Sequence, residues 1–445
     1  MQAIRFLVMG WAMLFAGSAL ADTYIYITNS TDQTVSINVH HHGSRTLTQG
    51  SQWAQEVSEI PPYETRRVLR FNRYWGVSRN HTFNFDTYVS NGQSTAVMQQ
   101  TMVGTWTGSN IRHSARAADF NAPWYSDRNI HRHGTQYGGK DSQIAFKAQF
   151  TGGYDDFYYT IHNNTPVEPL SAVDELKVLT YNIYALPFVA DKIGERLIEL
   201  PQNMQGYDVV MLQEAFDGRR DDFLLELAQE YPYQTHIPRA SFWSSWDMNV
   251  FDSGILIASR YPITNVADFV YPDCAGTDCF ADKSVVYAEI IKDGRAYHLT
   301  NTHATSFDTD EARALRMVEF QHMRDIVEAQ NIPAWEAVMF GGDFNVNKLL
   351  WPGDYAQMLG ILNATDPVST GHDATFDPRI NTLSQAYGSG GDTVEYLDYV
   401  VYANDHLQPV AARNDVRIPR STGQGVWGVW DLSDHYPVMG EFSFD

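Results

Sequence analysis

Short strand-forming segments recur along most of this chain, and only one long helical pattern accompanies them. Between residues 22 and 164, segments such as "TYIYIT", "TVSINVH" and "TFNFDTYV" alternate apolar and polar side chains, and turn sequences such as "TNSTDQ" separate them. Such alternation is typical of strands with one buried face. The sequence therefore predicts a mostly-β, sandwich-like domain over residues 22–164.

The pattern changes after a proline-containing stretch, "NNTPVEPLSAVDE", which predicts a linker at residues 165–175. Beyond it, apolar strands such as "LKVLTYNIYAL" and "EAVMFGGDFN" are mixed with helical segments such as "ADKIGERLIEL" and "RRDDFLLELAQEY". The longest helix should follow Asp308, its expected N-cap. Strands outnumber helices, so residues 176–445 should form two face-to-face sheets flanked by helices, which makes the chain α+β.

The first residues have the features of a secretory signal peptide. Arg5 precedes an apolar run from Phe6 to Phe15, and Ala19-Leu20-Ala21 fits a small-residue cleavage site. We expect cleavage after Ala21 and a secreted protein. The alternative, a membrane anchor, is disfavoured because the apolar run is short.

Two cysteines, Cys274 and Cys279, lie close together in "CAGTDC". A secreted chain permits a disulfide between them, and two free thiols are the alternative. A zinc site from two cysteines alone is disfavoured because such sites need four ligands.

The net charge of −22 is unevenly distributed. Residues 22–170 contain as many basic as acidic side chains, so the excess of acid lies after them. Lys and Arg make most contacts to nucleic-acid phosphates. We therefore expect no nucleic-acid partner, although bound metal ions can offset acidic charge.

Polar residues recur where the apolar strands of the second half end. Each alone could be a turn or cap residue, but an unpartnered polar group in a core segment is costly, so the set points to a site. The set is Asn182, Glu214, His303, Asp343, Asn345, Asp398, Asp434 and His435.

The composition of this set indicates a reaction. Carboxylate and amide oxygens suit a hard cation, most naturally Mg²⁺. Histidines suit acid–base catalysis near neutral pH, and Asp398 is the candidate acid that orients one of them. Metal-assisted attack of water on a phosphodiester uses these parts.

Six motifs, "TYNIY", "LQEAF", "NTHATS", "GGDFNVN", "LDYVV" and "SDHYPV", occur in this order between Lys177 and Phe444. Together they resemble the endonuclease/exonuclease/phosphatase superfamily, which implies a four-layer αββα sandwich and metal-dependent phosphoester chemistry. Within it, the chain is most similar to bacterial neutral sphingomyelinases C, which cleave sphingomyelin to ceramide and phosphocholine. The likeness rests on "SDHYPV", on "DCAGTDCFADKSVVYAEI" with Ser284 in place of a glycine, and on an aromatic pair before "SDH".

The resemblance implies a role for each metal-site residue. Glu214 would bind Mg²⁺ directly, and Asn182 and Asp434 would support that ion or its waters. Asp343 and Asn345 would hold a second ion, the attacking water and a phosphate oxygen. Mn²⁺ or Co²⁺ could substitute for Mg²⁺. A purely structural role as a hydrogen-bonding residue is the alternative for Asn182.

It also implies the acid–base roles. His435 would be the general base, oriented by Asp398, and His303 would bind the phosphate and assist the leaving alkoxide. The alternatives are two structural histidines and a strand-end turn residue at Asp398.

The segment "GQGVWGVW" precedes "SDH". In the resembled family an aromatic pair here lies on a β-hairpin that touches membrane. We expect Val426 and Trp427 to point outward at a hairpin tip and Trp430 to lie nearer its base, all contacting membrane. Ordinary core packing of the tryptophans is the alternative.

Histidines are also concentrated in the first half, in "HHH" at His40–His42 and in "HRH" at His131 and His133. His131 and His133 should share one strand face. A metal site there and a polar sandwich surface are the two interpretations. This accessory domain could bind membrane or carbohydrate, or could shield the enzyme.

These observations predict a secreted, monomeric, Mg²⁺-dependent sphingomyelin phosphodiesterase that acts at a membrane surface. A secreted metal-dependent nuclease of the same superfamily is one alternative. A lipid- or glycan-binding protein with an inactive catalytic half is the other.

Overall fold

A computed structural model describes residues 21–117, 121–240, 251–387 and 392–445. The chain divides into two compact units, Met1–Asn164 and Thr165–Asp445, called here the N-terminal and C-terminal units. The predicted signal peptide lies almost wholly at residues 1–20, outside the described residues. Within the described part of the chain, no helix is both long and apolar enough to cross a membrane.

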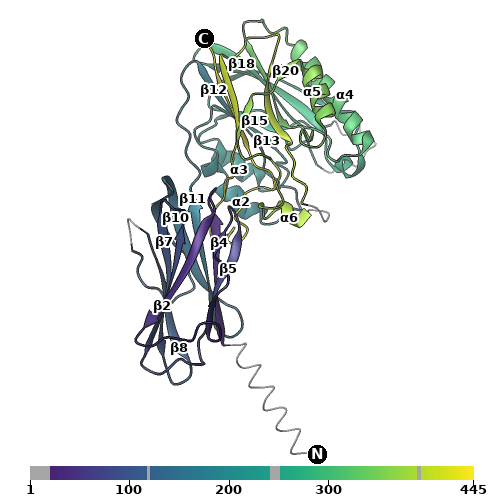
Figure 1. The fold of residues 1–445 in the computed structure, drawn as a ribbon. Coiled ribbons are helices and arrows are strands. Elements are labelled where there is room, and N and C mark those ends of the chain that lie inside the picture. The colour runs from purple at the N-terminus through teal and green to yellow at the C-terminus, as the bar shows by residue number, and fades with distance from the viewer. Residues whose placement is uncertain (1–20, 118–120, 241–250, 388–391) are drawn as a thin grey trace, which may run out of the picture. The chain divides into compact units, whose positions relative to one another are not determined.

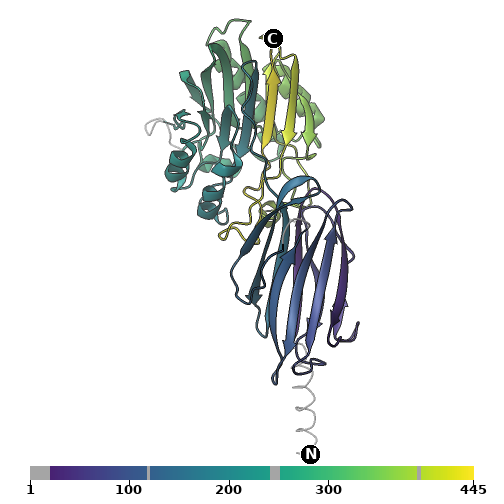
Figure 2. The same cartoon turned by 90° about the vertical axis from the view of Figure 1, so that its left-hand side faces the viewer.

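The N-terminal unit consists of two sheets, whose long strands run alongside one another in Figure 2. The first sheet has the order β3 (Trp53–Gln55), β5 (Thr65–Asn72), β1 (Asp22–Ser30), β11 (Asp155–Asn163), β10 (Lys140–Phe150) and β9 (His131–Tyr137). The second has the order β4 (Glu59–Ile60), β2 (Val35–Gly43), β6 (Thr82–Ser90), β7 (Thr95–Gly104) and β8 (Ser109–Arg116).

Alternating side chains build the core between these sheets. Along β6, every second residue is buried, including Phe83 and Phe85. Phe85 stacks on Phe71 of the other sheet with 4.4 Å between ring centroids. Residues from both sheets join in one apolar cluster. The prediction of a mostly-β, sandwich-like unit is therefore confirmed.

The "HHH" run in β2 follows the same alternation. His41 faces the core, where its ring stacks on Phe85 at 4.2 Å and its Nε2 accepts a hydrogen bond from the backbone N–H of Leu47. Successive side chains of a strand point to opposite faces, so His40 and His42 lie together on the outer face. The run thus combines one half-buried, inward-facing histidine with two that face outward.

His113 of β8 gives the N-terminal unit a predicted sensitivity to acid. Its ring packs among Phe146, Phe157 and Tyr125, and burial, followed by the charge of His131, lowers the pKa of His113 from 6.5 to about 4. The folded state therefore binds this proton less tightly than the unfolded chain. The free energy of unfolding is therefore unaffected by this group above pH 6.5. It falls by on the order of 3 kcal/mol as the pH drops from 6.5 to 4, because the unfolded chain takes up the proton first.

Hydrogen exchange of backbone amides in β8 and β10 measures this effect. Between pH 7 and pH 4, protection should fall by more in the wild-type protein than in His113→Leu, because the variant has no proton to take up. Equal losses in the two proteins would show that His113 does not cause the acid sensitivity.

The C-terminal unit also contains two sheets. The first has the order β14 (Tyr233–Gln234), β15 (Leu256–Ser259), β13 (Val209–Gln213), β12 (Glu175–Asn182), β24 (Val438–Ser443), β23 (Ala411–Val416) and β21 (Val368–Gly371). The second has the order β16 (Ile263–Val270), β17 (Ser284–Lys292), β18 (Arg295–His303), β19 (Ala337–Asp343), β22 (Asp398–Ala403) and β20 (Ala364–Thr365).

Helices cover the outer faces of these sheets. The helices are α2 (Ile193–Glu199), α3 (Arg220–Leu227), α4 (Asp310–Glu328), α5 (Pro352–Leu362) and α6 (Ser384–Tyr387), with short 3₁₀ turns η1 (Pro201–Asn203) and η2 (Gly276–Phe280). Figure 1 shows α4 and α5 side by side. The N-cap of α4 is Thr309, whose hydroxyl accepts from the N–H of Ala312, so the prediction of Asp308 was wrong by one residue.

Three apolar clusters define the layers. Ile193 and Phe223 of α2 and α3 pack with Leu179 of the first sheet. Inner residues of both sheets form a second cluster, and α4 and α5 pack with the outer face of the second sheet in a third. The predicted α+β class is confirmed, and this order of layers is consistent with an αββα sandwich.

Candidate active site

The strand register of the C-terminal unit brings distant polar residues to one edge of each sheet. In the first sheet, β12 and β13 are parallel, and Asn182 pairs with Gln213, so Asn182 and Glu214 lie at the same strand ends. Asp434 and His435 precede β24, which is antiparallel to β12 and pairs with it from Thr180. These residues therefore meet although they are distant in sequence.

The second sheet contributes a row of three residues. β18 and β19 are parallel, and His303 pairs with Asp343. β19 and β22 are antiparallel, and Asp343 pairs with Asp398. All three side chains are buried. The two sheets face each other through β12 and β19, so the row lies next to Asn182.

Asn182 links the carboxylates of the two sheets. Its Nδ2 donates to Glu214 Oε1 at 3.0 Å and to Asp343 Oδ2 at 3.1 Å, while its Oδ1 accepts from the N–H of Tyr184 at 3.0 Å. The amide thus presents its donor end to the carboxylates. In this arrangement Asn182 orients Glu214 and Asp343.

Burial raises the pKa of each acid in this group. Desolvation raises the pKa of Glu214, and together with the charge of Asp398 it raises the pKa of Asp343 to about 6. Desolvation, with the charge of Glu214 adding to it, raises the pKa of Asp434 to about 7. Three acids that are costly to ionise together favour a bound cation, which would stabilise their charged forms.

His435 and Asp398 form a buried pair. His435 Nδ1 lies 2.9 Å from Asp398 Oδ2, and its Nε2 lies 3.8 Å from Asp343 Oδ2. Burial disfavours the imidazolium, but the carboxylates of Asp398 and Asp343 outweigh it and raise the pKa of His435 well above its usual value. The ring of Phe376 contacts His435 edge-on at 5.4 Å. Asp398 therefore fixes the ring and leaves Nε2 toward the cluster.

His303 also lies close to the carboxylates. Its Nε2 is 3.7 Å from Asp343 Oδ2 and 3.9 Å from Glu214 Oε1. Burial, the charge of Lys283 and the charge of His435 lower the pKa of His303 well below its usual value. The electrostatics therefore favour the imidazolium at His435 and the neutral ring at His303. A cation held by the carboxylates would offset their pull on His435 and favour its neutral, proton-accepting form.

Two residues of the cluster have left-handed backbones. Glu214 has φ 57° and Asn345 has φ 51°. Non-glycine residues adopt this region uncommonly, and such strain gathers at functional sites. The N–H of Asn345 donates to Asp343 Oδ1 at 3.0 Å, and its Nδ2 donates to the carbonyl of Ala304 at 3.0 Å. These bonds hold the strained turn after β19.

The residues present fit a divalent cation. Among the described residues, Asp343, Asp398 and His435 offer ligand atoms that all lie within 4.8 Å of one another. Glu214 Oε2 is buried without a hydrogen-bond partner. Such an oxygen is costly unless something binds it. Buried carboxylates with an unpartnered oxygen match the oxygen ligands that hard cations prefer.

Three further residues near the site were missed in the sequence. Lys283 is buried, and its Nζ lies 3.2 Å from the carbonyl of Ala304. Burial and the charge of Asp308 raise the pKa of Glu395 to about 7. Arg196 is fully buried and donates to the carbonyls of Ile183 and Leu432, which joins the loops after β12 and before β24. Arg196 lies within α2 and the other two lie outside the strand-end pattern, so no local pattern in the sequence could reveal them.

The structure joins Cys274 and Cys279 in a disulfide with a Cα–Cα distance of 5.3 Å. This loop packs near the turn after His303, because Asp278 Oδ2 accepts from the N–H of Ser306 at 2.5 Å. The bridge therefore lies beside one of the candidate catalytic strands.

Within the predicted hairpin at residues 426–430, the expected outward orientation of Val426 was wrong. Residues 424–429 form turns, and the loop ends are tied by a buried ion pair between Arg420 and Asp431 at 2.9 Å. Val426 is fully buried and Trp430 is 6% exposed. Trp427 alone is partly exposed, and its ring contacts Trp430 at 5.0 Å. Because the loop folds back on itself, Val426 and Trp430 serve as packing residues.

Comparison with known proteins agrees with this geometry. Residues 179–435 match the endonuclease/exonuclease/phosphatase family, and this match spans more than half of the chain. The chain therefore belongs to that family. The matched segment begins in β12 and ends at His435, so it includes the strand-end residues described above.

Bacterial relatives define the group within the family. The chain is 32% identical to a sphingomyelinase C of Bacillus cereus over 315 residues, which covers 64% of this chain and 94% of the relative. It therefore belongs with the sphingomyelinases C, as its motifs predicted. The crystal structure of sphingomyelinase C from Streptomyces griseocarneus matches with a TM-score of 0.55 at 33% identity, covering 60% of this chain and 99% of that one. A beta toxin variant from Staphylococcus aureus, solved with bound magnesium ions, matches with a TM-score of 0.55 at 32% identity, covering 60% and 99%.

Proposed function

We propose that this protein is a secreted, Mg²⁺-dependent phosphodiesterase that hydrolyses sphingomyelin to ceramide and phosphocholine. The observation that carries the proposal is the meeting of Glu214, Asp343 and the His435–Asp398 pair at one edge of two facing sheets. The substrate is proposed from the names of the relatives, which are sphingomyelinases C.

The chain's own residues would divide the work as follows. His435 Nε2 accepts a proton from the attacking water, and Asp398 holds the opposite nitrogen and stabilises the imidazolium that forms. His303 would bind a phosphate oxygen and assist the departing ceramide alkoxide. Asn182 keeps Glu214 and Asp343 in place through its two donated hydrogen bonds.

Glu214, Asp343 and Asp434 are the proposed metal ligands, with Asn345 beside them. When bound, a divalent ion would polarise the phosphate and stabilise negative charge on its oxygens. Mg²⁺ is the proposed ion because the donors are carboxylates, which suit hard cations. The magnesium ions in the beta toxin variant support this choice.

Exposed apolar residues follow the same strands that carry the site. Phe188 is fully exposed in the loop after Asn182, and Phe307 is 52% exposed in the loop after His303. Leu349 and Leu350 are exposed after Asn345. Aromatic side chains favour the water–lipid interface. We therefore assign membrane contact to these loops, in place of Val426 and Trp430.

Replacing both Phe188 and Phe307 by alanine tests this assignment. Hydrolysis of sphingomyelin in vesicles should fall by about tenfold or more, because each buried aromatic ring contributes on the order of 1.5–3 kcal/mol. Cleavage of a soluble phosphocholine ester should be unchanged. Trp335→Ala is the matched control, since Trp335 is 74% exposed just before β19, at the strand end opposite Asp343. Equal losses on both substrates would contradict the assignment.

A parallel assay on three substrates tests the proposed activity. The full-length mature protein is incubated with sphingomyelin vesicles, phosphatidylcholine vesicles and plasmid DNA, each with Mg²⁺ or with EDTA. We expect phosphocholine from sphingomyelin with Mg²⁺ and none with EDTA. Nicking of DNA without lipid hydrolysis would favour a nuclease, and binding of vesicles without any hydrolysis would favour a binding protein.

A further inference from the structure

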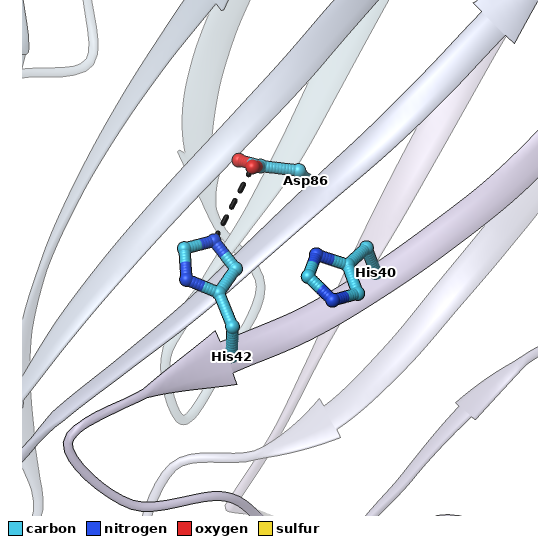
Figure 3. Close-up of side chains that lie close together, drawn as sticks. All are labelled: His40, His42 and Asp86. Atoms are coloured by element: carbon cyan, nitrogen blue, oxygen red, sulfur yellow. Dashed lines mark hydrogen bonds and ion pairs between the residues drawn. The ribbon is translucent and has the colours of Figure 1, made fainter.

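The outer face of the second N-terminal sheet holds a compact group of metal-ligating side chains. His40 and His42 project from the same face of β2, and Asp86 projects beside them from the neighbouring strand β6, where it pairs directly with His40 (Figure 3). The two imidazole rings stack with 5.1 Å between centroids. Their ligand atoms and the Asp86 carboxylate all lie within 4.8 Å of one another.

We propose that His40, His42 and Asp86 bind a divalent transition-metal ion of the zinc class, at a site separate from the active site. The group lies in the N-terminal unit, whereas every residue of the active site lies in the C-terminal unit.

The distances suit such an ion. Zinc bonds of 2.0–2.1 Å in tetrahedral geometry place neighbouring ligand atoms about 3.3 Å apart. His42 Nε2 and Asp86 Oδ2 are already 3.2 Å apart. His40 is exposed on the strand, so rotation of its side chain can bring its ring nitrogen to the same point. Three protein ligands leave the fourth position to water.

A neighbouring residue holds the carboxylate in place. Gln99 of β7 donates from Nε2 to Asp86 Oδ1 at 3.0 Å, which leaves Oδ2 directed at His42. Hydrogen bonds of this kind orient metal ligands and contribute about 10–100-fold to affinity. Gln99 is therefore a positioning residue of the site.

The types of ligand atom also favour one class of metal ion over another. Two imidazoles with one carboxylate suit Zn²⁺, Cu²⁺ or Ni²⁺, whereas Mg²⁺ prefers oxygen ligands alone. Other surface histidine–carboxylate pairs, such as His236 with Asp268 at 2.9 Å, belong to no group of three ligand residues among the described parts of the chain. His131 and His133, predicted as a possible metal site, likewise join no such group there.

Equilibrium dialysis of the untagged full-length protein against Zn²⁺ tests the proposal. Saturating Mg²⁺ is present throughout to occupy the active site, and bound zinc is counted by elemental analysis. We expect His42→Ala and the shape-conserving Asp86→Asn each to bind one zinc ion fewer per chain than the wild type. Gln99→Ala should keep the site but weaken it by about 10–100-fold.

His236→Ala is the matched control, and it should bind as much zinc as the wild type. Cobalt substitution gives a second readout, because the visible absorption of Co²⁺ reports nitrogen ligation in the wild type and should be lost in His42→Ala. Equal zinc binding by the wild type, His42→Ala and Asp86→Asn would overturn the proposal. A loss in His236→Ala equal to that in His42→Ala would also overturn it, because it would indicate non-specific surface binding.

Discussion

Replacement of His435 by alanine is expected to lower kcat for sphingomyelin hydrolysis by about 10²–10⁴-fold, the range that a positioned general base contributes. His435 Nε2 is the ring nitrogen that faces the carboxylate cluster, because Asp398 occupies Nδ1. Without it, the attacking water loses the base that Asp398 orients. Release of phosphocholine from mixed micelles measures the loss.

The hydrogen bond between His435 and Asp398 leads to a second prediction, for variants of Asp398. Asp398→Asn should lower kcat as well, because the ring loses the charge that fixes it and stabilises its protonated form. Residues that act as one unit lose activity non-additively. The double variant should therefore be no slower than His435→Ala alone. Magnesium affinity should stay near the wild-type value in His435→Ala. Full activity in that variant would contradict the assigned base.

Replacement of Glu214 by glutamine is expected to remove most metal binding and most activity together. The change keeps the shape that accepts from Asn182 but removes the charge at Oε1 and at the unpartnered Oε2. Residues that only orient a ligand contribute about 10–100-fold to metal affinity, so loss of a direct ligand should cost at least about 100-fold. Calorimetric titration with Mg²⁺ measures this loss.

The dependence of activity on Mg²⁺ concentration should also show that the Glu214→Gln variant binds the metal weakly. Activity of Glu214→Gln should rise with Mg²⁺ concentrations far above those that saturate the wild type, because weaker binding is overcome by mass action. Glu226→Gln is the control, since Glu226 is exposed on α3 and its carboxylate accepts a hydrogen bond from Gln229 Nε2. Unchanged Mg²⁺ affinity in Glu214→Gln would exclude Glu214 as a ligand.

The sequence was informative where two independent patterns coincided. Asn182, Glu214, His303 and Asp343 each end an apolar strand, and the parallel register of those strands brings them together. Both the strand and the polar residue at its end can be recognised locally. Lys283 and Glu395 carry no such signal, because their proximity to the site depends on how loops pack in three dimensions.

The incorrect prediction for residues 426–430 also has its cause in contacts between residues that are distant in the sequence. The aromatic pair before "SDH" suggested an open hairpin with Val426 outward, but the Arg420–Asp431 ion pair ties the loop ends together, and Val426 and Trp430 are buried. Such a long-range closure cannot be seen in a local pattern. The alternation in β2, by contrast, was visible in the sequence, and it sends His40 and His42 to one face and His41 to the other.

Hydrolysis of sphingomyelin in H₂¹⁸O tests the central claim most directly. If His435 activates water against phosphorus, then with Mg²⁺ the wild-type protein should release phosphocholine that carries one ¹⁸O atom, and ceramide without label. Mass spectrometry of the two products distinguishes them. Labelled ceramide, or no phosphocholine at all in the presence of Mg²⁺, would contradict the account.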